Sequence, residues 1–168
     1  ICNGEIYNYI ELRTFLKNKG FKFKTNSDVE VILYLYDIYG HECVKYLKGM
    51  FAFALWDNKK KELFIGRDRF GMKPLYFYKD KDRFIFSSTT KSIKNNSKIK
   101  TSINENSLHE YFLYGYIPSP TTIWKKIFIL PEAHYAVIKK GEMSIKNYWR
   151  VKIGNKKISK DKILAEID

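Results

Sequence analysis

The feature that most constrains the fold is an unbroken apolar run at residues 50–56, Met-Phe-Ala-Phe-Ala-Leu-Trp. The run shows no alternation between polar and apolar residues, which is typical of a strand buried on both faces. A charged turn follows, and residues 63–67 (Leu-Phe-Ile-Gly-Arg) predict the second strand of a hairpin. The sequence therefore predicts a hairpin whose first strand lies in the interior of the fold.

Helix and strand patterns precede this hairpin. Residues 8–19 carry apolar side chains near helical spacing, which predicts a helix. Residues 21–25 alternate apolar and polar side chains, so they predict a half-buried strand. Ser27, with Glu30 three positions later, predicts a capping box that opens a second helix. Asp28 would then lie in the first turn of that helix, where the helix dipole favours an anion.

The remaining stretches mix the same two patterns. They predict a short helix at 41–47, a hairpin of 74–78 with 83–87, a polar surface connection at 92–102, a short helix at 107–113, an extended segment at 116–120, a hairpin of 135–138 with 144–149 and a helix from Ser159 to Asp168. Helices combined with antiparallel strands in this way predict an α+β fold.

Composition limits the class of protein. A chain of 168 residues with 45% hydrophobic content suits one globular domain with a real core. No apolar run approaches the roughly 20 residues of a membrane span, so we expect no membrane partner. Two cysteines do not make a disulfide scaffold, and the three histidines are scattered along the chain. A structural metal site is therefore not expected.

The formal net charge of +13 raises the question of nucleic-acid binding. The lysines, however, are dispersed through turns such as residues 58–61 and 79–82. No basic stripe is interleaved with exposed aromatic residues, as binders of single-stranded nucleic acid require. We therefore interpret the charge as a solvated basic surface and expect no nucleic-acid partner.

The opening stretch carries the first functional hint. Asn3 and Gly4 form a dipeptide typical of turns, because both residues tolerate positive φ. A backbone N–H and a short side-chain amide that converge on one point are what an oxyanion hole needs. Local chemistry alone favours a plain loop between a strand and a helix. The choice between the two readings depends on the motifs that follow.

Four stretches in register resemble the glutamine-hydrolysing asparagine synthetases. They are residues 3–8 with 11–13, residues 27–33 after Thr25, residues 47–54 with 56–57, and residues 67–76. Weaker matches follow at 86–88, at 114–118, at 130–131 with His134, and at 148–149. The resemblance spans essentially the whole chain, and four motifs in order are far more specific than any one of them.

The resemblance implies an N-terminal-nucleophile hydrolase-type αββα sandwich that lacks its N-terminal strands. Residues 1–150 would be a glutaminase domain, and residues 151–168 a connection and first helix leading to an ATP-dependent synthetase domain. In this family an N-terminal cysteine attacks the side-chain amide of glutamine. The released ammonia reaches the second domain, where ATP with magnesium activates aspartate as an adenylate and ammonia converts it to asparagine. The resemblance also implies a cytoplasmic location and a possible homodimer.

Carried over by position, the resemblance assigns an oxyanion hole to the side chain of Asn3 and the backbone N–H of Gly4. It assigns the α-amino end of glutamine to Glu5 and Asp28, a reasonable role since an ammonium group prefers carboxylates. The motif that contains Arg67 also matches, but we expect a structural role there. An arginine flanked by carboxylates after a strand is more often a satisfied ion pair.

The family's nucleophilic cysteine has no counterpart in this chain. Cys2 directly precedes Asn3, and neighbouring residues on a strand point to opposite faces, so Cys2 should face the core if Asn3 faces glutamine. Cys2 would also lack a free α-amino group to act as its base. Cys43 lies in a mainly apolar helix and is expected to be a buried thiol. We therefore expect poor stability and no glutaminase turnover from this chain alone.

Other functions remain open. A relative could amidate another carboxylate, such as a sugar acid or a peptide, because the acceptor binds in the part that the chain lacks. A glutaminase-like module could also serve only as a binding surface. Two departures from the family pattern, Thr89 in place of Glu and Glu132-Ala133 in place of Pro-Gly, are expected to bear on the junction between domains. Alanine at the glycine position would be strained if that turn needs positive φ.

Overall fold

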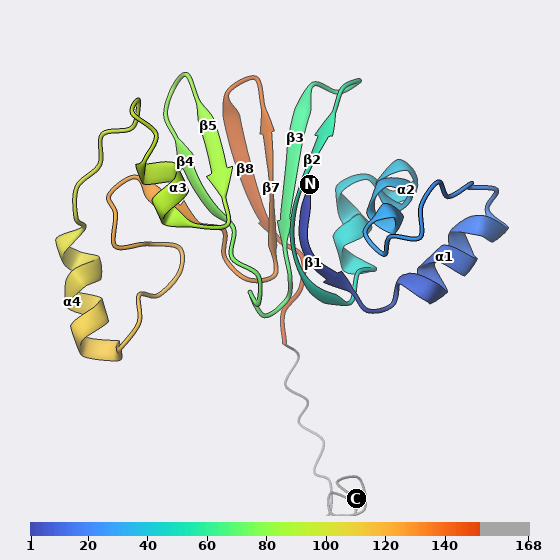
Figure 1. Ribbon diagram of the computed structural model, residues 1–168, viewed down its shortest axis with the longest axis horizontal. Coiled ribbons are helices and arrows are strands. Elements are labelled where there is room, and N and C mark those ends of the chain that lie inside the picture. Colours follow the sequence, from blue (N-terminus) through green and yellow to red (C-terminus); the bar gives the residue numbers. More distant parts are fainter. Residues whose placement is uncertain (152–168) are drawn as a thin grey trace, which may run out of the picture.

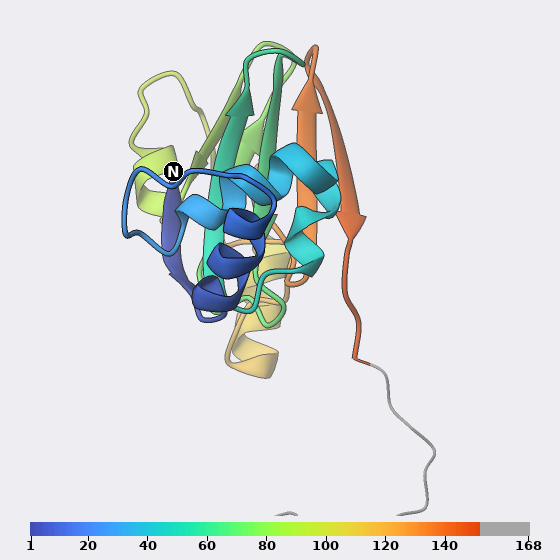
Figure 2. The same cartoon turned by 90° about the vertical axis from the view of Figure 1, so that its right-hand side faces the viewer.

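The computed structural model describes residues 1–151, in which two antiparallel sheets are stacked between two layers of helices (Figures 1 and 2). The first sheet has the strand order β1-β2-β3-β7-β8, and the second has the order β5-β4-β6. The strands are β1 (Cys2–Ile6), β2 (Gly49–Asp57), β3 (Glu62–Arg67), β4 (Tyr76–Lys79), β5 (Phe84–Ser87), β6 (Ile127–Ile129), β7 (His134–Lys139) and β8 (Glu142–Asn147). The first sheet is covered by helices α1 (Tyr9–Asn18) and α2 (Glu30–Tyr39) and the 3-10 helix η1 (Gly40–Lys45), and beyond the second sheet lie α3 (Thr90–Lys94) and α4 (Glu105–Tyr114).

This arrangement confirms the predicted α+β class and the αββα sandwich. The apolar run lies in β2, where residues 51–54 are all buried, as the sequence predicts. The side chains on its two faces differ in size. Phe51 and Phe53 pack with the helices, whereas Ala52 and Ala54 pack toward the second sheet. The large side chains fill the space under the helices, and the small ones let the two sheets approach each other.

Helix α2 fixes the first helical layer to the sheet. Val31, Ile32 and Leu35 are buried in one cluster with Phe51 and Phe53. Each such side chain contributes about 1.5–3 kcal/mol relative to an exposed position. The apolar stripe of α2 therefore anchors this layer to the sheet. The anchored helix in turn positions the residues that directly precede it.

The predicted strand at residues 21–25 is wrong. The backbone N–H groups of Lys24 and Thr25 donate to the carboxylate of Glu30, at 2.8 and 2.9 Å, rather than to a neighbouring strand. The capping box is wrong for the same reason, because Glu30 is occupied by these bonds and α2 begins at Glu30 itself. The N-cap residue is Val29, and no side chain caps it.

The turn predicted at Asn3 and Gly4 is also wrong, since both residues lie within β1 and pair with β2. The surface connection predicted at 92–102 begins instead within helix α3, whose Ile93 is buried. Strand β6 carries no alternating pattern long enough to be predicted, and it forms by pairing with β4. The three predicted hairpins and the helices at 8–19 and 107–113 are confirmed, apart from small shifts of their ends.

The helix predicted from Ser159 to Asp168 lies outside the described residues. The division of the chain at residue 150 stays a prediction. Across residues 1–151, no helix combines the length and the apolar character needed to cross a membrane.

Candidate functional site

The outer edge of β1 is the part of the fold around which the candidate residues lie. Ile1 exchanges backbone hydrogen bonds with Ala54, and the N–H of Tyr7 donates to the carbonyl oxygen of Lys48. In an antiparallel pair such bonds recur at every second residue, so the even-numbered residues of β1 direct their N–H groups away from β2. The N–H of Ile6 does so and donates to Asp28. The N–H of Gly4 therefore points outward along the same edge.

Gly4 is required at its position by geometry. Its φ is +137°, and a Cβ added there would lie 2.0 Å from the carbonyl oxygen of Met50. The contact is with backbone atoms of β2, so no side-chain rotation could relieve it. Gly4 thus uses the tolerance of positive φ noted from the sequence, although the local structure is a strand rather than a turn.

Asn3 and Cys2 point to opposite faces of β1. Asn3 borders a hollow of about 250 Å³ between the two sheets, together with Pro74, Leu75 and Ser87. Cys2 packs instead against the core cluster beneath the helices. The alternation predicted from strand geometry is therefore confirmed.

Glu5 and Asp28 meet around one hollow. They border a space of about 460 Å³ together with Tyr7, Tyr9 and Ser27. One carboxylate oxygen of Asp28 accepts the N–H of Ile6 at 2.7 Å, which fixes this side chain beside β1. Two carboxylates around one opening can bind a cation such as an ammonium group.

The four predicted site residues thus occupy neighbouring positions but not a single hollow. Asn3 borders the hollow between the sheets, whereas Glu5 and Asp28 border the hollow between the end of β1 and the segment that precedes α2. The N–H of Gly4 points out between the two. Asp28 lies just before α2 rather than in its first turn, because α2 begins two residues later, at Glu30.

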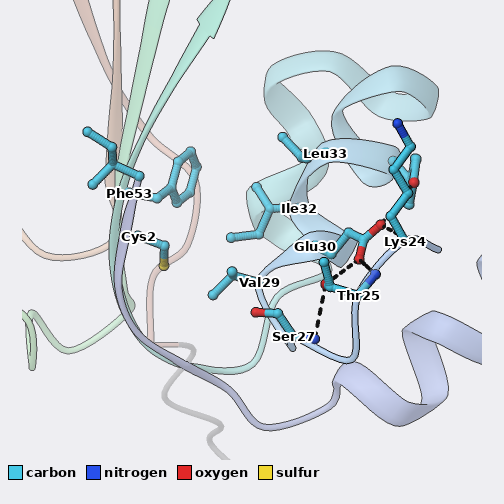
Figure 3. A pocket seen from close by; sticks show the side chains of 11 residues that line it. Cys2, Lys24, Thr25, Ser27, Val29, Glu30, Ile32, Leu33 and Phe53 are labelled. Atoms are coloured by element: carbon cyan, nitrogen blue, oxygen red, sulfur yellow. Dashed lines mark hydrogen bonds between the residues drawn. The ribbon is translucent and has the colours of Figure 1, made fainter.

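Glu30 is a residue that the sequence analysis assigned wrongly. Its carboxylate accepts the N–H groups of Lys24 and Thr25, the hydroxyl of Thr25 at 2.5 Å and the hydroxyl of Tyr34 at 3.0 Å. Figure 3 shows Glu30 and Thr25 joined in this way, with Ser27 donating in turn to Thr25. These bonds lower the pKa of Glu30 to about 2, and the bond from the Lys24 N–H has the largest effect. The visible signal in the sequence was an acidic residue directly before the apolar run of α2, residues 31–36.

The bonds of Glu30 hold the segment that carries Asp28. This segment faces β1 across a cavity of about 510 Å³, lined by Val29 and Ile32 from one side and by Cys2 and Phe53 from the other (Figure 3). Asp28 is therefore positioned by its own bond to β1 and by the Glu30 carboxylate behind it.

Neither cysteine is placed as a nucleophile. Burial raises the pKa of Cys2 to about 11 and the pKa of Cys43 to about 12. A thiol attacks as its thiolate, which is scarce near neutral pH when the pKa is this high. Cys43 is also fully buried, as predicted.

Arg67 and Asp68 have the structural role expected of their motif, but the predicted ion pair is wrong. The guanidinium of Arg67 donates to the carbonyl oxygens of Lys73, Gly71 and Leu130, at 2.8, 2.6 and 2.7 Å. The buried carboxylate of Asp68 accepts four backbone N–H groups, those of Phe51, Phe70, Met72 and Lys73. Both charges are satisfied by backbone groups, and together they fold the loop that joins the two sheets.

The two departures from the family pattern have local structural roles. Thr89 is the N-cap residue of α3, and its side chain accepts the N–H of Ser92. Ala133 has φ +56°, in the left-handed region, and is buried. The strain expected of alanine there is thus present, at about 1–2 kcal/mol. Their bearing on a domain junction stays a prediction.

Comparison with known sequences identifies the family. The sequence model of the glutamine amidotransferase domain matches residues 1–149. The chain belongs to this family.

Within residues 1–151, no three side chains of His, Cys, Asp or Glu lie together as a metal ion would require.

The chain is also similar to curated proteins named as glutamine-hydrolysing asparagine synthetases. The chain is 41% identical over 151 residues to putative asparagine synthetase [glutamine-hydrolyzing] 2 of Methanocaldococcus jannaschii, covering 89% of this chain and 29% of the relative. It is 38% identical over 168 residues to asparagine synthetase [glutamine-hydrolyzing] 3 of Bacillus subtilis, covering 99% of this chain and 27% of the relative. The chain thus spans less than a third of the length of these relatives.

Solved structures support the fold. The glutamine phosphoribosylpyrophosphate amidotransferase of B. subtilis, in complex with ADP and GMP, matches with a TM-score of 0.61 and 19% identity, covering 89% of this chain and 28% of that one. At this identity the likeness establishes the fold alone. The αββα sandwich predicted from the sequence is thus a fold shared with this amidotransferase.

Proposed function

We propose that this chain supplies the glutamine-binding wall of a glutaminase domain in a glutamine-hydrolysing asparagine synthetase. The outer edge of β1 binds the substrate, with the Asn3 side chain and the Gly4 N–H at the amide end and with Glu5 and Asp28 at the α-amino end. The observation that carries the proposal is the outward N–H of Gly4 beside the paired carboxylates, in a chain of the glutamine amidotransferase family.

The amide end requires donors that are fixed before the reaction. Gly4 is fixed by its close approach to Met50, and Asn3 is held in the same strand. When a nucleophile adds to the side-chain amide of glutamine, the carbonyl oxygen gains negative charge, which two rigid donors stabilise. Loss of one such donor typically costs about 10²–10³ in rate.

The α-amino end requires negative charge. Asp28 keeps one oxygen on the Ile6 N–H, and its carboxylate shares an opening with Glu5. A bound α-ammonium group would there donate charge-assisted hydrogen bonds to these two carboxylates. The two hollows lie on either side of Gly4, so an extended glutamine molecule could span them along the strand edge.

The rest of the proposed activity lies in a synthetase domain of the same polypeptide. Ammonia from glutamine would there amidate aspartate, with ATP and magnesium bound by that domain rather than by residues 1–151. The names of the curated relatives support aspartate as the acceptor over a sugar acid or a peptide. A cytoplasmic location fits the two free thiols of Cys2 and Cys43, and a homodimer is compatible with the proposal.

We further propose that this chain alone does not hydrolyse glutamine. Cys2 faces the core rather than the Asn3 side of β1, and the pKa values of both cysteines are raised. The attacking group would come from another part of the native polypeptide. Ammonia release by the chain alone would contradict this part of the proposal.

The test compares L-glutamine with glutaramate, the same amide without the α-amino group, as substrates of the native polypeptide that carries this chain. Wild-type protein should release ammonia from glutamine and prefer it strongly. Asp28→Asn keeps an acceptor for Ile6 but loses the charge, so kcat/KM for glutamine should fall roughly 10- to 100-fold, with little change for glutaramate.

Asp37→Asn, on the exposed face of α2, is the matched control and should leave both values unchanged. The proposal fails if wild-type protein releases no ammonia from glutamine. The assignment of Asp28 fails if the Asn variant discriminates between the two compounds as well as wild type does.

A further inference from the structure

The last turn of α4 and the residue after Gly115 expose an unusual concentration of large apolar side chains. Tyr111, Phe112, Leu113, Tyr114 and Tyr116 have 50%, 79%, 62%, 58% and 63% of their surface exposed. We call these five residues the α4 patch. Scattered exposed apolar residues are normal on a protein surface, but a contiguous group of this size marks an interaction site.

The α4 helix has little to hold it in the described structure. The side chain of Ser107 is its one buried side chain in residues 105–114. Four consecutive apolar residues at the end of the helix cover all of its sides, and a helix turn that is apolar all round is normally buried. Because residues 1–151 leave this turn largely exposed, only another part of the assembly could cover it.

The shape of the α4 patch is suited to a protein partner. Gly115 ends the helix with φ +77°, which turns the chain so that the rings of Tyr114 and Tyr116 lie 6.3 Å apart. Beside them Tyr111 and Tyr116 border a hollow of about 380 Å³, large enough to receive side chains of a partner. Tyrosine and phenylalanine are enriched at interface cores, where the ring is buried and the hydroxyl can still bind a polar group.

We infer that the α4 patch is the docking surface for the synthetase domain of the same polypeptide. More than two thirds of the length of each curated relative has no counterpart in this chain, so material for such a partner exists in the family. Figures 1 and 2 both place α4 toward the same end of the molecule as the coloured chain that leaves β8. The inference rests on the proposed function only in assuming that this domain is present.

A second copy of the chain fits the α4 patch less well. Each copy has a formal net charge of +13, so two copies repel each other over long range. A symmetric contact through a few aromatic residues would have to overcome this repulsion without the help of opposite charges. A domain joined to the chain binds at a high effective concentration and avoids that cost.

Hydroxyl-radical footprinting of the native polypeptide tests the inference through side-chain exposure. Leu113 and Ile10 both lie on helices and both have 62% of their surface exposed in residues 1–151. If the α4 patch is covered, Leu113 and Phe112 should be labelled several-fold more slowly than Ile10 after correction for intrinsic reactivity. Equal labelling of Leu113 and Ile10 would overturn the inference.

Two further measurements identify the occupant. Leu113→Glu should restore labelling of Phe112 and Tyr116, whereas Ile10→Glu should not, and continued protection in Leu113→Glu would count against the inference. Light scattering at the same concentrations gives the oligomeric state. Protection that disappears on dilution together with a dimer would mean that a second copy covers the α4 patch, and would overturn the assignment to the synthetase domain.

Failure of this inference and failure of the proposed function give different results. Ammonia release is measured on the same samples. A protected α4 patch without ammonia release from glutamine would leave the docking surface in place and remove the proposed function. Ammonia release with an unprotected α4 patch would support the proposed function and remove the docking surface.

Discussion

Replacing Gly4 by alanine tests whether the edge of β1 is as tightly constrained as the structure indicates. The φ of +137° would strain an L-residue by about 1–2 kcal/mol. The new Cβ would also lie 2.0 Å from the carbonyl oxygen of Met50, and overpacking of this kind costs about 1–3 kcal/mol. The sum is about 2–5 kcal/mol of unfolding free energy, a large fraction of the roughly 5–15 kcal/mol of a typical domain.

Gly115→Ala is the matched control, because Gly115 also has positive φ, at +77°, but has no atom within 4 Å of an added Cβ. It should cost only the strain of about 1–2 kcal/mol. Urea unfolding followed by circular dichroism gives both values, with unchanged m-values showing that the compared states are the same. The reasoning is refuted if Gly4→Ala is no more destabilising than Gly115→Ala.

Two further substitutions test the polar groups that shape the site. The pKa of Glu30 is lowered to about 2 from an ordinary 4.5, so its contribution to stability is complete above about pH 4.5 and is lost as the pH falls toward 2. Unfolding of Glu30→Gln should therefore depend less on pH across this window than unfolding of wild type, and parallel profiles would contradict this. Asp68→Asn loses two of the four charge-assisted bonds to backbone N–H groups and should cost about 3–6 kcal/mol. Asp82→Asn, on an exposed turn, should stay within about 0.5 kcal/mol, and equal effects of the two in urea unfolding would be evidence against the role of Asp68.

Much of the fold could be predicted because burial leaves a direct pattern in the sequence. The unbroken apolar run of β2 identified a strand with two buried faces, and the hairpins followed from turns between apolar runs. Strand geometry also separated Asn3 from Cys2 correctly. These inferences depend on neighbours along the chain, which the sequence contains.

The failures share one physical cause, namely that a partner outside the local pattern decided the structure. Residues 21–25 have the pattern of a strand, but Glu30 takes the N–H groups that a strand would offer. Asn3 and Gly4 have the pattern of a turn, but pairing with β2 extends them. Arg67 has the carboxylate of Asp68 beside it in sequence, yet its buried guanidinium donates to carbonyl oxygens, one of them that of Leu130.

The most direct test of the central claim is the steady-state glutaminase activity of the native polypeptide with Asn3→Ala. If the β1 edge stabilises the developing oxyanion, kcat should fall about 10²–10³-fold while KM for glutamine changes little. Loss confined to KM would place Asn3 in substrate binding alone, and a kcat equal to that of wild type would contradict the assignment of the oxyanion hole to this strand.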